Sequence, residues 1–275
     1  MGRFLGIDFS GNHLMWRPGC GRSNVWISDV RKAGKRLVLE RLLRVHELPG
    51  DEHPMDRLAA LLREGNFDAA GIDAPFSVPR AFIPPVGYAG LLERIGSLPD
   101  PDGRPFCQSA DFVKAIAGVS PPLNPPKPMR STDTYWSQKG LNVRSTLWAG
   151  ARGGAAMTAA CFKLLHLAQR PIWPWAQESS GLLVEAFPMA QLKQWGFSYN
   201  EYGKQNRNGE LLRKQIIDEM RGRIDLGAFV AVLVSNADAL DSVLCAFAGL
   251  AIKTSSIAVP PDDSALFEGW VAVHA

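Results

Sequence analysis

The chain has 275 residues, of which 46% are hydrophobic and 21% charged, a composition typical of a globular protein with a sizeable core. Its formal net charge of +3 is too small to require a polyanionic partner and does not exclude one. The four cysteines are widely separated, which argues against a disulfide framework or a structural zinc site and favours a reducing compartment. No apolar run approaches the roughly 18–20 residues of a membrane span, and no signal-peptide pattern is visible, so we expect a cytoplasmic protein.

The first part of the sequence predicts an α/β arrangement. Residues 3–11 (RFLGIDFSG) are a short apolar run that ends at Ser-Gly, which predicts a buried strand. Residues 24–34 and 35–48 predict two further strands, although the second could also form a helix by composition. Residues 53–65 predict a helix with proline near its start and glycine at its end. Residues 67–76 return as a strand, so we expect the first and fourth strands to be parallel neighbours.

The sequence changes character after the fourth strand. Residues 77–152 hold most of the prolines and little periodicity, and they predict an insertion of loops and short helices. Regular elements then return: a helix over 153–169, a strand over 181–188, some helix within 199–223, a helix over 236–253 and a closing strand over 268–275. We expect a single domain over residues 1–275.

Acidic residues stand where apolar runs end. Asp8, Asp73 and Glu185 each come late in a predicted strand, and open α/β sheets bind ligands at the carboxyl ends of their strands. Asp238 and Asp241 are three residues apart at the start of an apolar helix, and therefore share one face. If that helix packs beside the first strand, these carboxylates converge and need a cation. Oxygen ligands select Mg²⁺ or Mn²⁺, and a pair of such ions supports in-line attack on a phosphodiester.

Each acid also has a structural interpretation. A single strand-end aspartate commonly makes turn or cap hydrogen bonds, and Asp238 and Asp241 could favour the helix dipole. Glu185 could pair with an arginine. The metal-site hypothesis therefore depends on joint placement, and above all on the sequence Gly-Ile-Asp, which occurs at both 6–8 and 71–73.

Five motifs resemble those of a known family. GIDFSG, GIDAPFSVP, VEAFP, DALDSVLCAFAG and EGWV are similar, in order and spacing, to a widespread prokaryotic family of unknown function. That family is described as predicted nucleases of the RNase H-like fold, related to the RuvC Holliday-junction resolvases. The resemblance implies an RNase H-like, mixed five-stranded sheet flanked by helices, with the proline-rich insertion after the fourth strand.

The resemblance also implies a nuclease that uses two Mg²⁺ or Mn²⁺ ions and a water nucleophile. Asp8 and Asp238 would be bridging or first-metal ligands, and Asp73 and Asp241 would complete the shell of the second metal. RuvC-like enzymes commonly carry glutamate on the fourth strand, where this sequence has the shorter Asp73. Glu185 could then fill in, directly or through water.

Basic residues supply candidate contacts to nucleic acid. Arg130, with Asp133, falls where the family tends to keep an Arg-Asp motif, and it belongs to a basic stretch that also contains Arg144. Lys204 and Arg213 precede the last helix, and we expect these side chains to meet phosphates. The alternative is a solvated surface, which the sequence favours slightly for Arg213.

Two other functions fit parts of the pattern. An acetate-kinase-like or actin-like phosphotransferase opens with a similar strand turn, but it needs a second half with its own phosphate loop, and the sequence offers only AGARGGAA at 149–156. A catalytically inactive nucleic-acid-binding module on the same fold is the other alternative, and the intact acids argue against it. RuvC-like resolvases act as dimers, and a homodimer is compatible with this sequence although no dimer face is evident.

Overall fold

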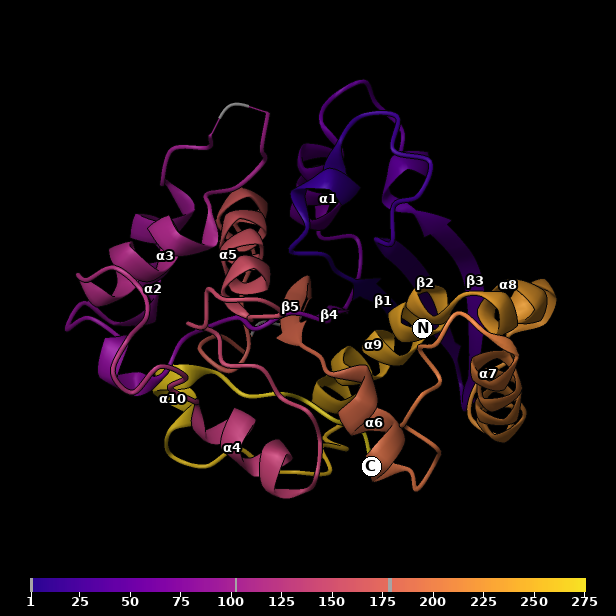
Figure 1. Cartoon of the computed structure of the whole chain (residues 1–275). Coiled ribbons are helices and arrows are strands. Elements are labelled where there is room, and N and C mark those ends of the chain that lie inside the picture. The colour runs from indigo at the N-terminus through magenta and orange to yellow at the C-terminus, as the bar shows by residue number, and fades with distance from the viewer. Residues whose placement is uncertain (1, 102, 178–179) are drawn as a thin grey trace.

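The computed structural model describes residues 2–101, 103–177 and 180–275, and its core is one five-stranded sheet (Figure 1). The strands are β1 (Gly2–Asp8), β2 (Trp26–Ala33), β3 (Arg36–Arg44), β4 (Ala69–Ile72) and β5 (Leu182–Glu185). The helices are α1 (Pro54–Glu64), α2 (Gly87–Gly96), α3 (Ser109–Ala117), α4 (Ser131–Gln138), α5 (Ala155–Ala168), α6 (Pro188–Gln194), α7 (Arg207–Met220), α8 (Val230–Ser235), α9 (Ala237–Lys253) and α10 (Ala265–Glu268). In the described part of the chain, none of them is long and apolar enough to cross a lipid bilayer.

The sheet is mixed, as predicted. Its strand order is β3-β2-β1-β4-β5, in which β1, β2 and β3 are antiparallel neighbours and β1, β4 and β5 run parallel. Ile7 of β1 pairs with Ile72 of β4, which confirms that the first and fourth strands are parallel neighbours. The arrangement is an α/β fold, and its order is consistent with an RNase H-like sheet.

Two apolar cores cover the two faces of the sheet. Successive side chains of a strand point to opposite faces. In β1, Leu5 and Ile7 join the core that α1 and α5 cover, whereas Phe4 joins the core that α9 covers. In β4, Ile72 lies on the α5 side and Ala69 on the α9 side. The alternation therefore decides which strand residues can reach α9.

Glycines let α9 pack directly on β1 and β4. A Cβ atom at Gly6 would lie 1.9 Å from the carbonyl oxygen of Ser242, and one at Gly71 would lie 1.9 Å from the carbonyl oxygen of Cys245. Both distances are far shorter than van der Waals contact, so any other residue would displace the helix. Farther along α9, Gly249 is close to Ala69.

The direction of α9 follows from these contacts. As residue numbers rise along β4, the helix residues that they touch fall in number, so α9 runs antiparallel to β1 and β4. Its first turn therefore lies at the carboxyl ends of those two strands. In Figure 1 the gold helix α9 crosses the sheet beneath β1 and β4.

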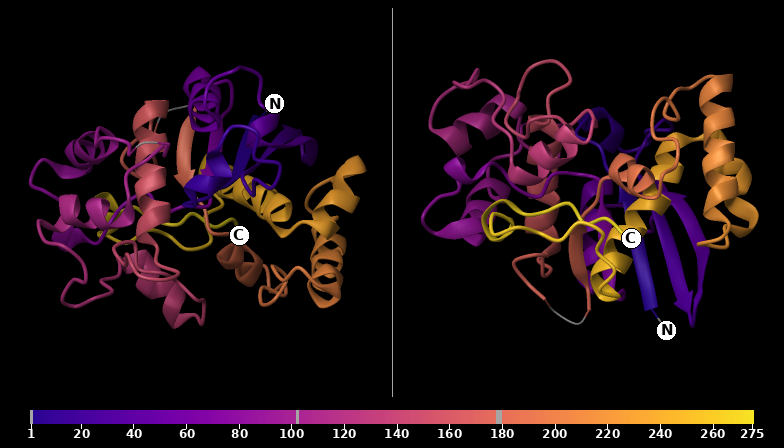
Figure 2. Two further views of the ribbon diagram at one scale, coloured as in Figure 1. Left: turned by 45° about the horizontal axis from the view of Figure 1, so that its top comes forward. Right: turned by 90° about the horizontal axis from the view of Figure 1, so that it is seen from below.

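The flanking elements extend the two ends of the sheet. The described part of the predicted insertion contains the α-helices α2, α3 and α4, of which α2 and α3 pack against α5 and α4 contacts α10. At the other end, α7 and α8 lie beyond the β3 edge (Figures 1 and 2). There the Leu39 N–H donates to the Asp225 carbonyl at 2.8 Å, which covers part of an otherwise open strand edge.

Residues 268–275 do not form the predicted closing strand. In this segment only His274 makes a β-bridge, with Ile257. The Ala272 N–H donates to the carbonyl of Glu185 at 3.0 Å, but no ladder continues from that bond. The apolar run at this end of the chain reflects burial of an irregular segment instead of sheet pairing.

Candidate active site

Four aspartates lie at the carboxyl ends of β1 and β4. Asp8 ends β1 and Asp73 directly follows β4, each two residues beyond a glycine that contacts α9. Because side chains two residues apart share a face of a strand, both aspartates lie on the α9 side. Asp238 and Asp241 stand in the first turns of α9, and this helix begins at the same edge of the sheet. The structure therefore brings the four predicted aspartates to one place.

The other three aspartates of this group all act on Asp8. Its side chain is 6% exposed, and burial raises its pKa well above the ordinary range. The charges of Asp241, Asp73 and Asp238 raise that pKa further. Burial also raises the pKa of Asp241, together with the charges of Asp73 and Asp238, while a hydrogen bond from Tyr202 lowers it. A group of acids that suppress one another's ionisation is strongly stabilised by a cation.

The groups around Asp73 shift its pKa in both directions. Burial raises the pKa of Asp73 to about 7, and the charge of Glu185 adds to this effect. The guanidinium of Arg144 acts in the opposite direction. The pKa of Asp238 is also raised by burial and lowered by Arg213. Two arginines thus offset part of the acidic charge without forming an ion pair with either aspartate.

The pKa of the Cys245 thiol also indicates that the aspartates lie close together. Cys245 lies one helical turn after Asp241 on α9. Burial raises the pKa of this thiol well above its ordinary value, and the carboxylates of Asp73, Asp8 and Asp241 raise it further. Three aspartates from separate segments therefore act on one buried atom. A thiol held neutral in this way is a poor metal ligand.

The donor set fits a hard divalent cation. Carboxylate oxygens are the ligands that Mg²⁺ and Mn²⁺ prefer. As the side chains are oriented, no three His, Cys, Asp or Glu residues in the described ranges already form a group that could hold an ion. The residue types and their location at one edge of the sheet fit the cation.

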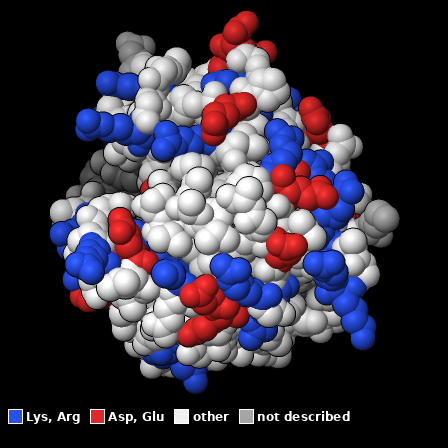
Figure 3. Space-filling view, turned by 90° about the vertical axis from the view of Figure 1, so that its right-hand side faces the viewer, with Lys and Arg blue, Asp and Glu red and all other residues white. Residues whose placement is uncertain are grey.

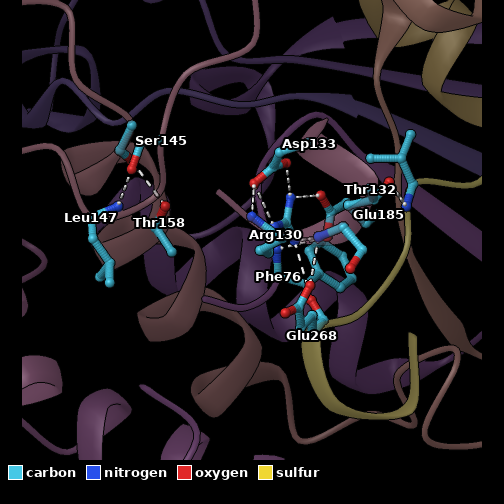
Figure 4. A network of polar contacts seen from close by, with 12 residues as sticks. Phe76, Arg130, Thr132, Asp133, Ser145, Leu147, Thr158, Glu185 and Glu268 are labelled. Atoms are coloured by element: carbon cyan, nitrogen blue, oxygen red, sulfur yellow. Dashed lines mark hydrogen bonds and ion pairs between the residues drawn. The ribbon is translucent and has the colours of Figure 1, made fainter. Parts of the chain in front are cut away.

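Glu185 acts on Asp73, but its carboxylate is paired with Arg130. Its Oε1 accepts from Nη2 of Arg130 at 2.6 Å, and its Oε2 accepts from Nη1 of Arg130 at 2.8 Å and from the Phe76 N–H at 3.0 Å (Figure 4). Both side chains of the ion pair are almost completely buried. On β5, Glu185 shares the face of Leu183, which packs in the α5 core. The structure therefore contains the pairing with an arginine, which is one of the two roles predicted for Glu185.

Arg130 and Asp133 have structural contacts in place of the predicted substrate contacts. The guanidinium of Arg130 donates from Nε to Asp133 Oδ2 at 3.0 Å and from Nη2 to Asp133 Oδ1 at 2.8 Å (Figure 4). Together with Glu185, these bonds leave no open side of the guanidinium for a phosphate. Glu268 closes the network, because it accepts from the backbone N–H of Ser131 at 2.6 Å.

Lys204 and Arg213 do not form a common basic surface. Arg213 is fully buried and donates to the backbone carbonyls of Val234 at 2.7 Å and of Lys204 at 3.1 Å, and also to that of Tyr202. Lys204 is exposed and pairs with Glu201. On the face that carries α7 and α8, Lys and Arg alternate with Asp and Glu around an uncharged centre (Figure 3). This face offers no continuous basic track.

Two further residues complete the site, and sequence reasoning did not single them out. The Tyr202 hydroxyl is buried and donates to Asp241 Oδ1 at 2.7 Å. Arg144 is exposed and lines, with Asp73, a pocket of about 290 Å³. Membership in the basic stretch was the one sequence signal for Arg144. Tyr202 lies in an irregular polar stretch that carries no comparable signal.

Comparison with known proteins places the chain in a family. Residues 6–265 match the family described as "Protein of unknown function (DUF429)". The chain belongs to this family. The DUF429 match spans all four aspartates and confirms the predicted membership of an uncharacterised family. No curated protein and no solved structure matches the chain.

Proposed function

We propose that this DUF429 protein is a nuclease that hydrolyses phosphodiester bonds with divalent cations held by Asp8, Asp73, Asp238 and Asp241. The observation that carries the proposal is the convergence of these four acids from three segments onto one edge of the sheet. Burying unneutralised carboxylates costs several kcal/mol, so their joint placement calls for a cation. When bound by these residues, Mg²⁺ or Mn²⁺ would supply an activated water and would stabilise the leaving oxygen.

The four aspartates are assigned as metal ligands, and Tyr202 is assigned a positioning role. Asp8, on which the other three acids act, and Asp238 are assigned as bridging or first-metal ligands. Asp73 and Asp241 would complete the shell of the second metal. Tyr202 orients Asp241 through its hydroxyl. The RNase H-like strand order and the resemblance to predicted nucleases support nucleic acid as the substrate.

Cleavage of labelled DNA and RNA tests the proposal directly. Single-stranded, duplex and branched substrates are incubated with Mg²⁺ or Mn²⁺ and with wild type, Asp8→Asn, Asp238→Asn or Asp51→Asn. Asp51 is an exposed aspartate outside the site and serves as the matched control. We expect wild type and the control to cleave, and both site variants to lose activity while remaining folded.

A calorimetric Mn²⁺ titration of the same proteins gives a second readout. Saturable binding that Asp8→Asn and Asp238→Asn both abolish is expected. Full cleavage activity in Asp8→Asn would refute the site assignment. A folded wild type that binds no Mn²⁺ would favour an inactive nucleic-acid-binding module, and stabilisation by ATP without any cleavage would favour the phosphotransferase alternative.

A further inference from the structure

The pocket beside Asp73 has a lining that the metal site does not explain. Its walls come from the loop after β4, the loop that precedes α5, and the starts of α5 and α6. Much of the lining is apolar and includes Pro75, Val143, Met157, Phe187, Met189 and Val271. Apolar walls are not what a cation or a bare phosphate requires. They are suited to the faces of a flat organic group.

The size of the pocket limits its ligand. Its volume is about 290 Å³, at the lower end of the range of roughly 300–1,000 Å³ found for small-molecule sites. One nucleotide fits such a volume, whereas a stretch of double helix does not enter a pocket. Phe187 is partly exposed and lines the wall, and aromatic rings of this kind stack on bases.

The charges at the pocket point to a phosphate. Two arginines line it, and the guanidinium of Arg130 is fully engaged with Asp133 and Glu185. Arg144 is exposed, and within the part of the chain that the structure describes its side chain makes no hydrogen bond or ion pair. It is nevertheless near enough to lower the pKa of Asp73. A free guanidinium next to the acidic group is well placed to bind a phosphate of the substrate.

We propose that this pocket receives one unstacked nucleotide of the substrate, with the base against Phe187 and Met189 and a phosphate at Arg144. The inference rests on the proposed nuclease function and specifies its substrate class. Single strands, loops and ends present such a nucleotide, and a free mononucleotide presents the same chemistry. An uninterrupted duplex presents it only after a base is flipped out, which costs a few kcal/mol.

Fluorescence anisotropy with a labelled single-stranded oligonucleotide tests the proposal. Binding is measured with Ca²⁺ as the hard cation, for the single strand and for the same strand annealed to its complement. The variants are Arg144→Gln, Met189→Trp, which fills the pocket, and Arg41→Gln, which removes an exposed arginine from β3 at the far edge of the sheet. Adenosine 5′-monophosphate and thymidine 5′-monophosphate serve as competitors.

We expect the single strand to bind more tightly than the duplex. Arg144→Gln should weaken binding of the single strand about tenfold, the usual effect of losing a hydrogen bond to a charged group. Met189→Trp should weaken it similarly, and Arg41→Gln should bind as wild type. Competition by a mononucleotide would identify the free nucleotide as a sufficient ligand. Competition by single-stranded oligonucleotide alone would identify the polymer as the source.

Wild-type affinity in both pocket variants, or tighter binding of the duplex, would overturn the proposal. Arg144 is exposed, so its variant is expected to fold even if Met189→Trp does not. The outcome also separates the two proposals. Nucleotide binding that depends on Arg144 without cleavage in any cation would refute only the nuclease, and Asp8-dependent cleavage with unchanged binding in both pocket variants would refute only the pocket.

Discussion

Gly6 and Gly71 stand side by side on parallel strands, and each marks a point at which α9 touches the sheet. The two residues pair in register, and a Cβ atom at either would lie 1.9 Å from a backbone carbonyl oxygen of the helix. The aspartate two residues later lies on the same face of its strand. In each Gly-Ile-Asp motif, the glycine lets α9 pack closely and the aspartate points toward the first turn of that helix. This double role explains why the motif occurs twice.

Gly71→Ala should destabilise the protein. The new methyl group would overlap the Cys245 carbonyl, and overpacking of this kind costs about 1–3 kcal/mol or more. Urea unfolding measures the loss. Gly21→Ala is the control, because a Cβ there meets no atom within 4 Å, and it should be neutral or slightly stabilising. Equal midpoints for the two variants would contradict the packing argument.

The stability of the metal-free protein should depend on pH through Asp73. Burial, and then Glu185, raise the pKa of Asp73 from its ordinary 3.8 to about 7 in the folded protein. Between these values the folded state binds the proton and the unfolded state does not. The free energy of unfolding should therefore fall as pH rises from about 4 to about 7, and level off above that. The contribution of Asp73 approaches about 1.4 kcal/mol per pH unit in this interval.

Asp73→Asn isolates this contribution. Urea unfolding of wild type and Asp73→Asn is measured in a chelator at several pH values, and the difference between their free energies is plotted. Wild type should lose stability relative to the variant as pH rises. Saturating Mn²⁺ should flatten the curve. A difference that stays constant between pH 4 and pH 7 would show that Asp73 has an ordinary pKa.

Arg130→Met should be strongly destabilising. It leaves the carboxylates of Asp133 and Glu185 buried without their cation, and breaking a buried ion pair from one side costs about 3–5 kcal/mol. Urea unfolding measures the effect. Glu185→Gln is informative for a different reason, since a supporting role predicts that it keeps Mn²⁺ binding. If Glu185→Gln abolishes that binding as Asp8→Asn is expected to do, Glu185 is a ligand after all.

Tyr202→Phe should weaken Mn²⁺ binding by roughly tenfold while the fold persists. The lost hydroxyl orients Asp241, and hydrogen bonds that hold a metal-binding carboxylate in this way typically contribute roughly 10–100-fold to metal affinity. Calorimetric titration measures the change. Tyr199→Phe is the matched control, because the Tyr199 hydroxyl bonds to Lys193 outside the acidic group. An unchanged affinity in Tyr202→Phe would remove Tyr202 from the site.

Short-range patterns were sufficient for most of the fold. The strands around Asp8 and Asp73 and the helix that begins near Asp238 followed from hydrophobic periodicity and turn residues. The parallel pairing of the first and fourth strands followed from the order of these elements along the chain. Periodicity and turn signals act over a few residues, so one sequence displays them. They failed for 268–275, where a short apolar run is buried without forming a strand.

The tertiary structure decided which partner each charged residue has. By itself the sequence determined which acids end the strands and begin the last helix, and so which four aspartates could share a cation. It left open whether Glu185 binds a cation or pairs with an arginine. The answer depends on the face of β5 to which Glu185 points and on Arg130, 55 residues away in the chain. The sequence could not reveal Tyr202 or Arg144 as neighbours of the acids either. Partners of buried charges are set by sheet register and helix packing, and these arise from contacts that no local pattern encodes.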